Sequence, residues 1–311
     1  MGKTNWQGRV DNPVTPLTLR YHQIVKVIEH TALSQGEKSV AFVGFECEAG
    51  VARNQGRIGA KDAPQALRQA LSSISWHGSE KSMLYDTGNI TCHNDELEEA
   101  QQALGKRVKD ILEKKIPVIV LGGGHETTYG HYLGVRQAYP QAKIGIINID
   151  AHFDMRPYEK QTSSGTMFRQ ILDEDSNASY FVVGIQRYGN TRDLFEQANK
   201  YGVNYILEDE MLGHLEQVQA RLAEFIEAHE VVYVTLCTDV LNAAEAPGVS
   251  APSPFGLSAI QVRHLLRFIT AFEKVVSFDI CEVNPALDLD LRTVKLGAHL
   301  INEVVLQFTD L

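Results

Sequence analysis

The chain has 311 residues, of which 44% are hydrophobic and 22% are charged. This composition is ordinary for a globular protein and excludes a collagen, a coiled coil or an intrinsically disordered chain. The formal net charge of −10 gives no basic field that would attract a phosphate backbone, so we expect no nucleic-acid partner. No apolar run approaches about 20 residues, and the first 20 residues are polar, so we expect a cytoplasmic protein without a membrane segment.

Short runs rich in Val and Ile alternate with longer segments of helical periodicity from about residue 39 onward. Several runs are apolar at nearly every position, which is typical of parallel strands covered by helices on both faces. The predicted strands are Ser39–Gly44, Met83–Asp86, Val118–Leu121, Ile144–Ile149, Tyr180–Gly184, Asn204–Ile206, Val231–Leu236 and Val275–Ile280. The predicted helices are Asp95–Lys114, Thr127–Ala138, Thr191–Tyr201, His214–Ala228, Ser258–Phe272 and Leu289–Phe308. This alternation predicts one α/β domain over residues 1–311, with an irregular lead-in over residues 1–38.

Unusual residues gather at the ends of three predicted strands, at GGGHE (122–126), DAHFD (150–154) and CTD (237–239). Ligands collect at the carboxyl ends of strands both in a closed barrel and in an open three-layer sheet. The spacing of the elements alone does not choose between these two folds. The three segments are therefore the first place to look for chemistry.

Asp150, His152 and Asp154 alternate along an extended segment, so their side chains point to one side of it. Two carboxylates and an imidazole suit a divalent ion such as Mn²⁺ better than a structural Zn²⁺. His125 follows three glycines and would add a fourth ligand. Taken alone, these residues could instead be a turn cap and a surface pair. The glycines show no GxGxxG spacing and no following Lys-Ser/Thr, so a phosphate site is not favoured.

The motifs together resemble the ureohydrolase family, which includes arginase and agmatinase. The resemblance rests on GGGHE at 122–126, NIDAHFD at 148–154, the segment 235–248 that ends in Ala246-Pro247-Gly248, and SFDICEVNP at 277–285. It implies a three-layer α/β/α sandwich with a mostly parallel eight-stranded sheet. It also implies a homo-oligomer that acts on a small molecule with two Mn²⁺ ions per subunit. The metal ligands that it implies are His125, Asp150, His152, Asp154, Cys237 and Asp239.

In this family the metal ions activate water for attack on a guanidinium or amidinium carbon. The resemblance implies that Asp154 moves the proton and that Glu282 holds the cationic C–N group, although Glu282 could instead be a helix-start carboxylate. Cys237 stands where the family usually has a carboxylate, and a thiol binds Mn²⁺ poorly, so we expect one ion to be held weakly. Alternatively, Cys237 is a buried core residue. The sequence also leaves open a disulfide between Cys237 and Cys281.

Phe168 stands where arginase carries a histidine that contacts its substrate, which argues against arginase itself. The stretches 53–61, 163–171, 184–191 and 235–239 are similar instead to the branch that hydrolyses N-formimidoyl-L-glutamate to glutamate and formamide in histidine degradation. A dicarboxylate substrate needs guanidinium groups, although any one arginine could instead form a structural ion pair. Besides Glu282, the expected substrate contacts are Arg57, Arg169, Arg187 and Asn190. The alternatives are another amidinohydrolase, such as an agmatinase or a guanidino-acid hydrolase, and a non-catalytic metal-binding regulator.

Overall fold

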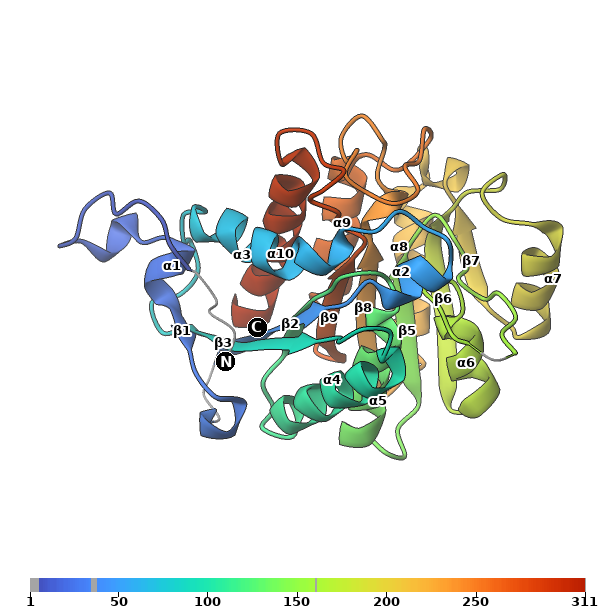
Figure 1. The fold of residues 1–311 in the computed structure, drawn as a ribbon, viewed down its shortest axis with the longest axis horizontal. Coiled ribbons are helices and arrows are strands. Elements are labelled where there is room, and N and C mark those ends of the chain that lie inside the picture. The colour runs from blue at the N-terminus through green and yellow to red at the C-terminus, as the bar shows by residue number, and fades with distance from the viewer. Residues whose placement is uncertain (1–5, 35–37, 160, 311) are drawn as a thin grey trace.

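The computed structural model of the protein describes residues 6–34, 38–159 and 161–310. In these residues a nine-stranded, all-parallel sheet runs through the middle of the molecule in the order β1-β3-β2-β4-β9-β8-β5-β6-β7 (Figure 1). Its strands are β1 Val25–Val27, β2 Ser39–Glu46, β3 Met83–Thr91, β4 Val118–Leu121, β5 Ile144–Ile149, β6 Ala178–Ile185, β7 Asn204–Leu207, β8 Val231–Cys237 and β9 Val275–Cys281. Because β1 and β7 are separate edges, the sheet is open and is not a barrel.

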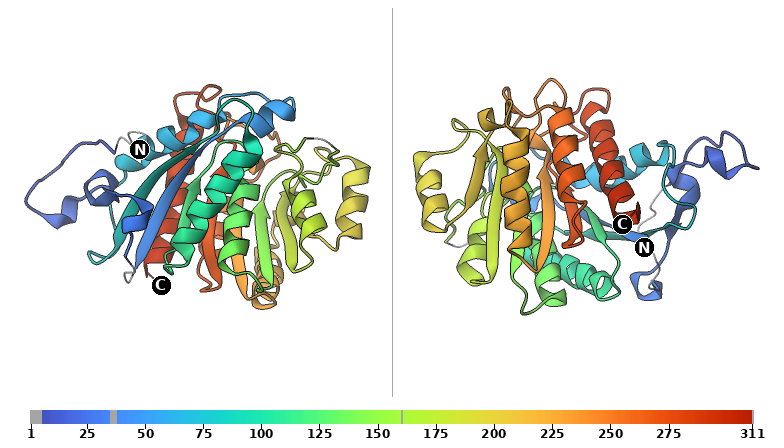
Figure 2. Two further views of the ribbon diagram at one scale, coloured as in Figure 1. Left: turned by 60° about the horizontal axis from the view of Figure 1, so that its bottom comes forward. Right: turned by 180° about the vertical axis from the view of Figure 1, so that it is seen from behind.

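Helices cover both faces of the sheet, which makes three layers (Figure 2). On one face, α3, α8, α9 and α10 bury their apolar sides in one hydrophobic cluster, and on the other face α4, α5, α6 and α7 bury theirs in a second. The helices are α1 Tyr21–Ile24, α2 Ala49–Arg53, α3 Ala63–Ser72, α4 Leu97–Leu112, α5 Thr127–Ala138, α6 Met167–Glu174, α7 Arg192–Lys200, α8 Leu215–Glu227, α9 Ala259–Ile269 and α10 Arg292–Asp310. The double covering explains why β4, β5 and β8 are buried at every position.

The prediction of eight strands was wrong by one strand. The additional strand, β1, lies within the segment predicted to be irregular and pairs in parallel with β3, with Val25 opposite Leu84. It escapes sequence analysis because it has only three residues, two of them exposed, so it carries no apolar run. Of the predicted lead-in, residues 1–5 and 35–37 lie outside the described residues.

The order of the strands places the chemistry at the centre of the sheet. β4, β9, β8 and β5 are consecutive neighbours, so the residues that follow their carboxyl ends meet on the same side of the molecule, at the middle of the sheet. Cys237 and Cys281 end neighbouring strands and lie opposite each other in the register, and both thiols are free. None of the described helices has the length and apolar character to cross a membrane.

Candidate active site

A cavity of about 110 Å³ lies where the four central strands end. Most residues that the sequence marks as catalytic or metal-binding contribute to its wall, namely His125, His152, Asp154, Cys237, Asp239 and Glu282. Asp150 is fully buried beside them. Segments more than 150 residues apart in the chain are thus brought together, as the parallel sheet predicts.

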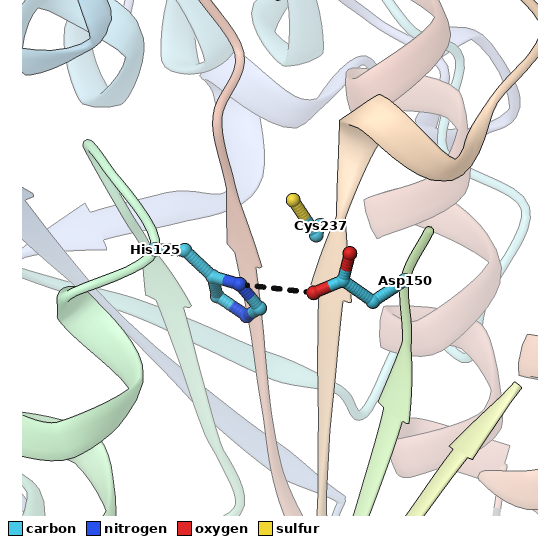
Figure 3. Close-up of side chains that lie close together, drawn as sticks. All are labelled: His125, Asp150 and Cys237. Carbon is cyan, nitrogen blue, oxygen red and sulfur yellow. Dashed lines mark ion pairs between the residues drawn. The ribbon is translucent and has the colours of Figure 1, made fainter. Parts of the chain in front are cut away.

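His125 stands at the centre of the polar contacts, and Figure 3 shows its ring beside Asp150 and Cys237. Its Nδ1 lies 2.9 Å from Oδ2 of Asp154 and 3.2 Å from Oδ2 of Asp150, and its backbone N–H donates to Oε1 of Glu282 at 3.0 Å. Cys237 faces the same space, since donor atoms of His125, Asp150 and Cys237 all lie within 4.8 Å of one another. One imidazole, three carboxylates and a thiol therefore converge there.

His152 connects the remaining carboxylate to this group. Its Nδ1 lies 3.1 Å from Oδ2 of Asp239 and 3.7 Å from Oδ1 of Asp150. Donor atoms of Asp150, His152 and Asp239 also lie within 4.8 Å of one another. Asp150 belongs to both groups, so the predicted ligands form one continuous cluster.

The two residues predicted to be catalytic are among eight described non-glycine residues with a positive φ. Asp154 has φ of 48° and Glu282 has φ of 65°, in the left-handed region that non-glycine residues seldom occupy. Such backbone is retained where the surrounding structure requires it, often at functional sites. The GGGHE loop has a requirement of its own, because a Cβ on Gly123 would lie 1.9 Å from the carbonyl oxygen of Cys47. Only glycine lets the two segments approach so closely.

Crowding of acidic groups perturbs their ionisation. Burial, followed by the charges of Glu126 and Asp239, raises the pKa of Glu282 to about 8, and burial together with the Asp150 carboxylate raises the pKa of Asp154. Burial opposes ionisation of Asp150 as well, but its hydrogen bonds to His125 and His152 outweigh burial and hold its pKa well below the ordinary value. The site thus holds more negative charge than its histidines can balance.

The donor set fits a divalent cation. Its members are carboxylates and imidazoles, the groups that bind ions such as Mn²⁺. Oδ1 of Asp239 is buried and has no hydrogen-bond partner among the described residues, which leaves an acceptor for a positive charge. Cys237 is the least suitable member, because burial and then the charges of Asp150 and Asp239 raise the pKa of its thiol well above the ordinary value.

The structure does not bring the three predicted substrate arginines into the cavity wall. The guanidinium of Arg57 donates to the carbonyl oxygens of residues 249 and 250. Arg169 pairs with Asp173 and stacks over the Tyr201 ring, which is the structural alternative that the sequence had left open. Arg187 is exposed. Their contact with a substrate stays a prediction.

Asn190 lines the cavity, but its amide is already occupied. Oδ1 accepts a hydrogen bond from the backbone of Phe153 at 3.0 Å, and Nδ2 donates to the carbonyls of Ala151 and Gln186 at 2.9 and 2.8 Å. Asn190 therefore anchors the loop that carries the predicted ligands. Phe168 is fully buried and stacks on Tyr180 with ring centroids 4.0 Å apart, so it supports the floor of the site.

Sequence analysis missed Arg156, an arginine that does line the cavity. Arg156 is exposed, and its guanidinium pairs with no acidic side chain in the described part of the chain. It follows Asp154 by two residues, so the alternation along 150–154 could have been extended to include it. Asn54, Ser164 and Ser250 also contribute to the wall and have no sequence signal that separates them from other loop residues.

An open three-layer sheet with a carboxylate and histidine cluster at its central strand ends is the architecture of an α/β enzyme with a candidate metal site. The chain belongs to the arginase family, whose model matches residues 38–307. A formimidoylglutamase of Lysinibacillus sphaericus is 53% identical over 304 residues, covering 96% of this chain and 94% of that protein. A formimidoylglutamase of Geobacillus sp. is 50% identical over 309 residues, covering 98% and 95%.

Solved structures agree with the fold. The crystal structure of formimidoylglutamase from Bacillus subtilis has a TM-score of 0.86 at 22% identity, covering 97% of this chain and 96% of that chain. Trypanosoma cruzi formiminoglutamase, solved with Mn²⁺, has a TM-score of 0.79 at 26% identity, covering 87% and 93%. The first likeness supports the arginase-type architecture. The second relative was solved with the ion that the donor set suggests.

Proposed function

We propose that the chain is a manganese-dependent hydrolase that converts N-formimidoyl-L-glutamate and water to L-glutamate and formamide in cytoplasmic histidine degradation. The observation that carries the proposal is the cluster of His125, Asp150, His152, Asp154 and Asp239 in a cavity that also exposes an unpaired arginine. Full-length relatives named for this activity support the choice of substrate.

The metal would be held by His125, Asp150, His152, Asp154 and Asp239, with Cys237 beside them. We propose two Mn²⁺ ions, because one continuous cluster offers two overlapping sets of donors that share Asp150. Bound there, the ions would supply an activated water and neutralise charge that develops on the substrate. The weaker position is the one next to Cys237, because a neutral thiol is a poor ligand for a hard ion.

The residues of the chain orient the substrate and move protons. Glu282, held by the backbone N–H of His125, faces the cavity and carries a carboxylate that can pair with the cationic formimidoyl group. Asp154 lies where it can accept a proton from the attacking water and deliver it to the leaving nitrogen. The new C–O bond forms as the C=N bond opens and the carbon becomes tetrahedral. The C–N bond to glutamate then breaks as the glutamate nitrogen takes the proton, and formamide is released.

Arg156 would bind a carboxylate of the substrate. It lines the cavity, and its guanidinium has no acidic partner among the described residues. An arginine binds carboxylates through paired hydrogen bonds. This feature favours a dicarboxylic substrate over agmatine, a dication that would be repelled by Arg156.

The proposed activity is tested by incubating the protein with Mn²⁺ and N-formimidoyl-L-glutamate and following the products by proton NMR. We expect glutamate and formamide in equal amounts and no urea from arginine or agmatine. Urea release from either compound without turnover of the formimidoyl substrate would overturn the proposal in favour of another amidinohydrolase. No turnover of any of these substrates in protein loaded with Mn²⁺ would favour a regulator.

The proposed role of Arg156 is tested by the variant Arg156→Gln. Losing a charge-assisted hydrogen bond of about 1.5–3 kcal/mol should raise KM by roughly 10- to 100-fold and change kcat less. Arg192→Gln is the matched control, because Arg192 is exposed at the start of α7 and lies outside the cavity wall. An equal change of KM in the two variants would contradict the role of Arg156.

A further inference from the structure

Behind His125, on the side away from the cavity, lies a chain of fully buried polar side chains that the proposed reaction does not use. Its members are Thr128, His131, Thr235, Ser277 and Asp279. Buried polar groups are costly unless they are hydrogen-bonded to one another. A cluster of this size inside a hydrophobic sheet therefore calls for an explanation.

The cluster forms a continuous path from His125 to His131. Nε2 of His125 lies 3.0 Å from Oγ1 of Thr235, which donates to Oδ1 of Asp279 at 2.5 Å. The other oxygen of Asp279, Oδ2, lies 2.6 Å from Nδ1 of His131. Nε2 of His131 lies 2.7 Å from Oγ of Ser277. Asp279 thus stands in the middle of the path and is held on both of its oxygens.

The number of available protons fixes the direction of these bonds. An ionised carboxylate only accepts hydrogen bonds, and a threonine hydroxyl has one proton to give. Oδ1 of Asp279 accepts hydrogen bonds from Thr235 and Thr128, and Oδ2 lies 2.6 Å from Nδ1 of His131, so both oxygens of this carboxylate act as acceptors. Because Thr235 donates its proton to Asp279, the Nε2 of His125 must be the donor to Thr235.

This direction decides which nitrogen of His125 can bind a metal. In the metal-free structure Nδ1 faces the carboxylates of Asp150 and Asp154 and donates a proton to them. A metal would take the place of that proton, and with Nε2 protonated the lone pair of the neutral imidazole would then be on Nδ1. If Thr235 instead turned its proton toward Nε2, the proton of the neutral ring would move to Nδ1 and block that position. A histidine that binds a metal commonly has its other nitrogen fixed in this way by a carboxylate.

Secondary structure sets the path rigidly. Thr128 and His131 are three residues apart in α5, so they lie on one side of the helix, and His125 lies in the turn just before it. Thr235 is on β8, and Asp279 lies directly opposite it on β9 in the register of the sheet. The side of the helix is therefore held against two central strands by hydrogen bonds rather than by apolar contacts alone.

We propose that Asp279 is a positioning residue of the metal centre. Acting through Thr235, it keeps His125 protonated on Nε2 so that Nδ1 is free to bind Mn²⁺, and His131 holds the Asp279 carboxylate in place. The inference rests on the proposed function, because it takes His125 as a metal ligand. It adds a residue that touches neither metal nor substrate but controls the ligand that does.

The test measures Mn²⁺ affinity directly, by electron paramagnetic resonance of the free ion. Asp279→Leu removes the acceptor of the Thr235 proton, and Thr235→Val removes the acceptor of the His125 Nε2–H. We expect each to weaken the tightest Mn²⁺ binding by roughly 10- to 100-fold. Asp279→Asn and Thr235→Ser are the conservative counterparts. Each keeps an oxygen at the required position and should retain more of the Mn²⁺ affinity than the apolar variant of the same residue.

Asp86→Asn is the matched control. Asp86 is also a fully buried aspartate, but it pairs with Arg68 two strands away from the site, so the variant should lower the melting temperature and leave Mn²⁺ affinity unchanged. Wild-type affinity in both Asp279→Leu and Thr235→Val, or an equal loss in Asp86→Asn, would overturn the role of Asp279. Failure of the wild-type protein itself to bind Mn²⁺ would instead contradict the proposed function.

Discussion

Cys237 is the residue at which the chemistry of the site is most unusual. It is 2% exposed and ends β8, next to Asp239. Burial and the charges of Asp150 and Asp239 raise the pKa of its thiol, so the thiol is neutral at ordinary pH. A neutral thiol neither repels its acidic neighbours nor binds a hard cation well. Compared with a carboxylate at this position, Cys237 therefore destabilises the metal-free site less. It also lowers the affinity of one metal position.

We predict that Cys237→Asp reverses both effects. The added carboxylate should increase the affinity of the weaker Mn²⁺ position at least about tenfold, because hard ions prefer oxygen ligands. It should also lower the melting temperature of the chelator-treated protein, because another buried charge joins Asp150 and Asp239. Metal titration and thermal unfolding measure the two effects. Cys92→Ser, outside the cavity, should change neither quantity. If the weaker Mn²⁺ position of Cys237→Asp keeps its wild-type affinity, the prediction is contradicted.

Glu282 gives a pH dependence with a definite sign. Its pKa rises from near 4.5 to about 8 in the folded, metal-free protein. Between these values the unfolded chain loses the proton and the folded chain keeps it, so this group makes the protein less stable as pH rises. Glu282→Gln keeps the acceptor for the His125 N–H and removes the titration. We predict that the variant gains on the order of 3 kcal/mol over wild type between pH 5 and pH 9.

Urea unfolding of both proteins in the presence of a chelator measures the effect of Glu282. Groups common to both proteins, such as Asp154, contribute nearly equally and cancel in the difference. A difference in unfolding free energy that stays constant over this pH range would show that Glu282 ionises normally. The same variant should lose most of its turnover when loaded with Mn²⁺, because it no longer presents a charge to the cationic group.

At the scale of elements, the loop that follows β5 is held by the loop that follows β6. The connection is Asn190, whose amide binds the backbone of Ala151, Phe153 and Gln186. We predict that Asn190→Ala destabilises the protein by about 1–3 kcal/mol and weakens Mn²⁺ binding, with KM for substrate changed less. Asn199→Ala, on the exposed face of α7, is the control. A change confined to KM would favour the substrate contact predicted from the sequence.

The strands and the clustering of the candidate ligands were predictable from the sequence for one physical reason. Parallel strands covered on both faces are apolar along their whole length, so their ends are visible as the first polar residues. Asp150 and His125 follow such ends, and Cys237 is the last residue of β8. The helix α3 was missed, although Leu67 and Leu71 lie one turn apart and Pro64 suits a first turn. The buried face of α3 also carries Arg68 and Ser72, so its apolar periodicity is incomplete.

The directions of the loop arginines were not predictable. Arg57 and Arg156 both lie in loops near the site, but only Arg156 lines the cavity, whereas Arg57 turns to backbone carbonyls. Loop side chains follow no period, so sequence spacing does not tell which way they point. A different limit hid the contact between His131 and Asp279, because it joins a helix and a strand that are distant in the sequence.

At the scale of the whole molecule, the site and the lead-in lie on different parts of one sheet. The predicted ligands follow β4, β5 and β8 at its centre, whereas the lead-in adds β1 at one edge (Figure 1). The net charge of −10 does not prevent the chain from binding an acidic substrate, because the groups that line a cavity set the electric field inside it. We expect the sheet edge at β1 and β3 to contribute to the stability of the fold and not to Mn²⁺ binding.

Arg68 and Asp86 make this separation testable. Both are fully buried, with Nε of Arg68 2.8 Å from Oδ2 of Asp86, and Trp6 of the lead-in donates to the same carboxylate. We predict that Arg68→Met lowers the unfolding free energy by about 3–5 kcal/mol, because it leaves a buried charge unpaired, and that Arg68→Met/Asp86→Leu loses less. Urea unfolding measures both. Mn²⁺ affinity should stay at the wild-type value in each variant that folds, and a loss there as large as in Asp279→Leu would mean that the edge and the site are coupled.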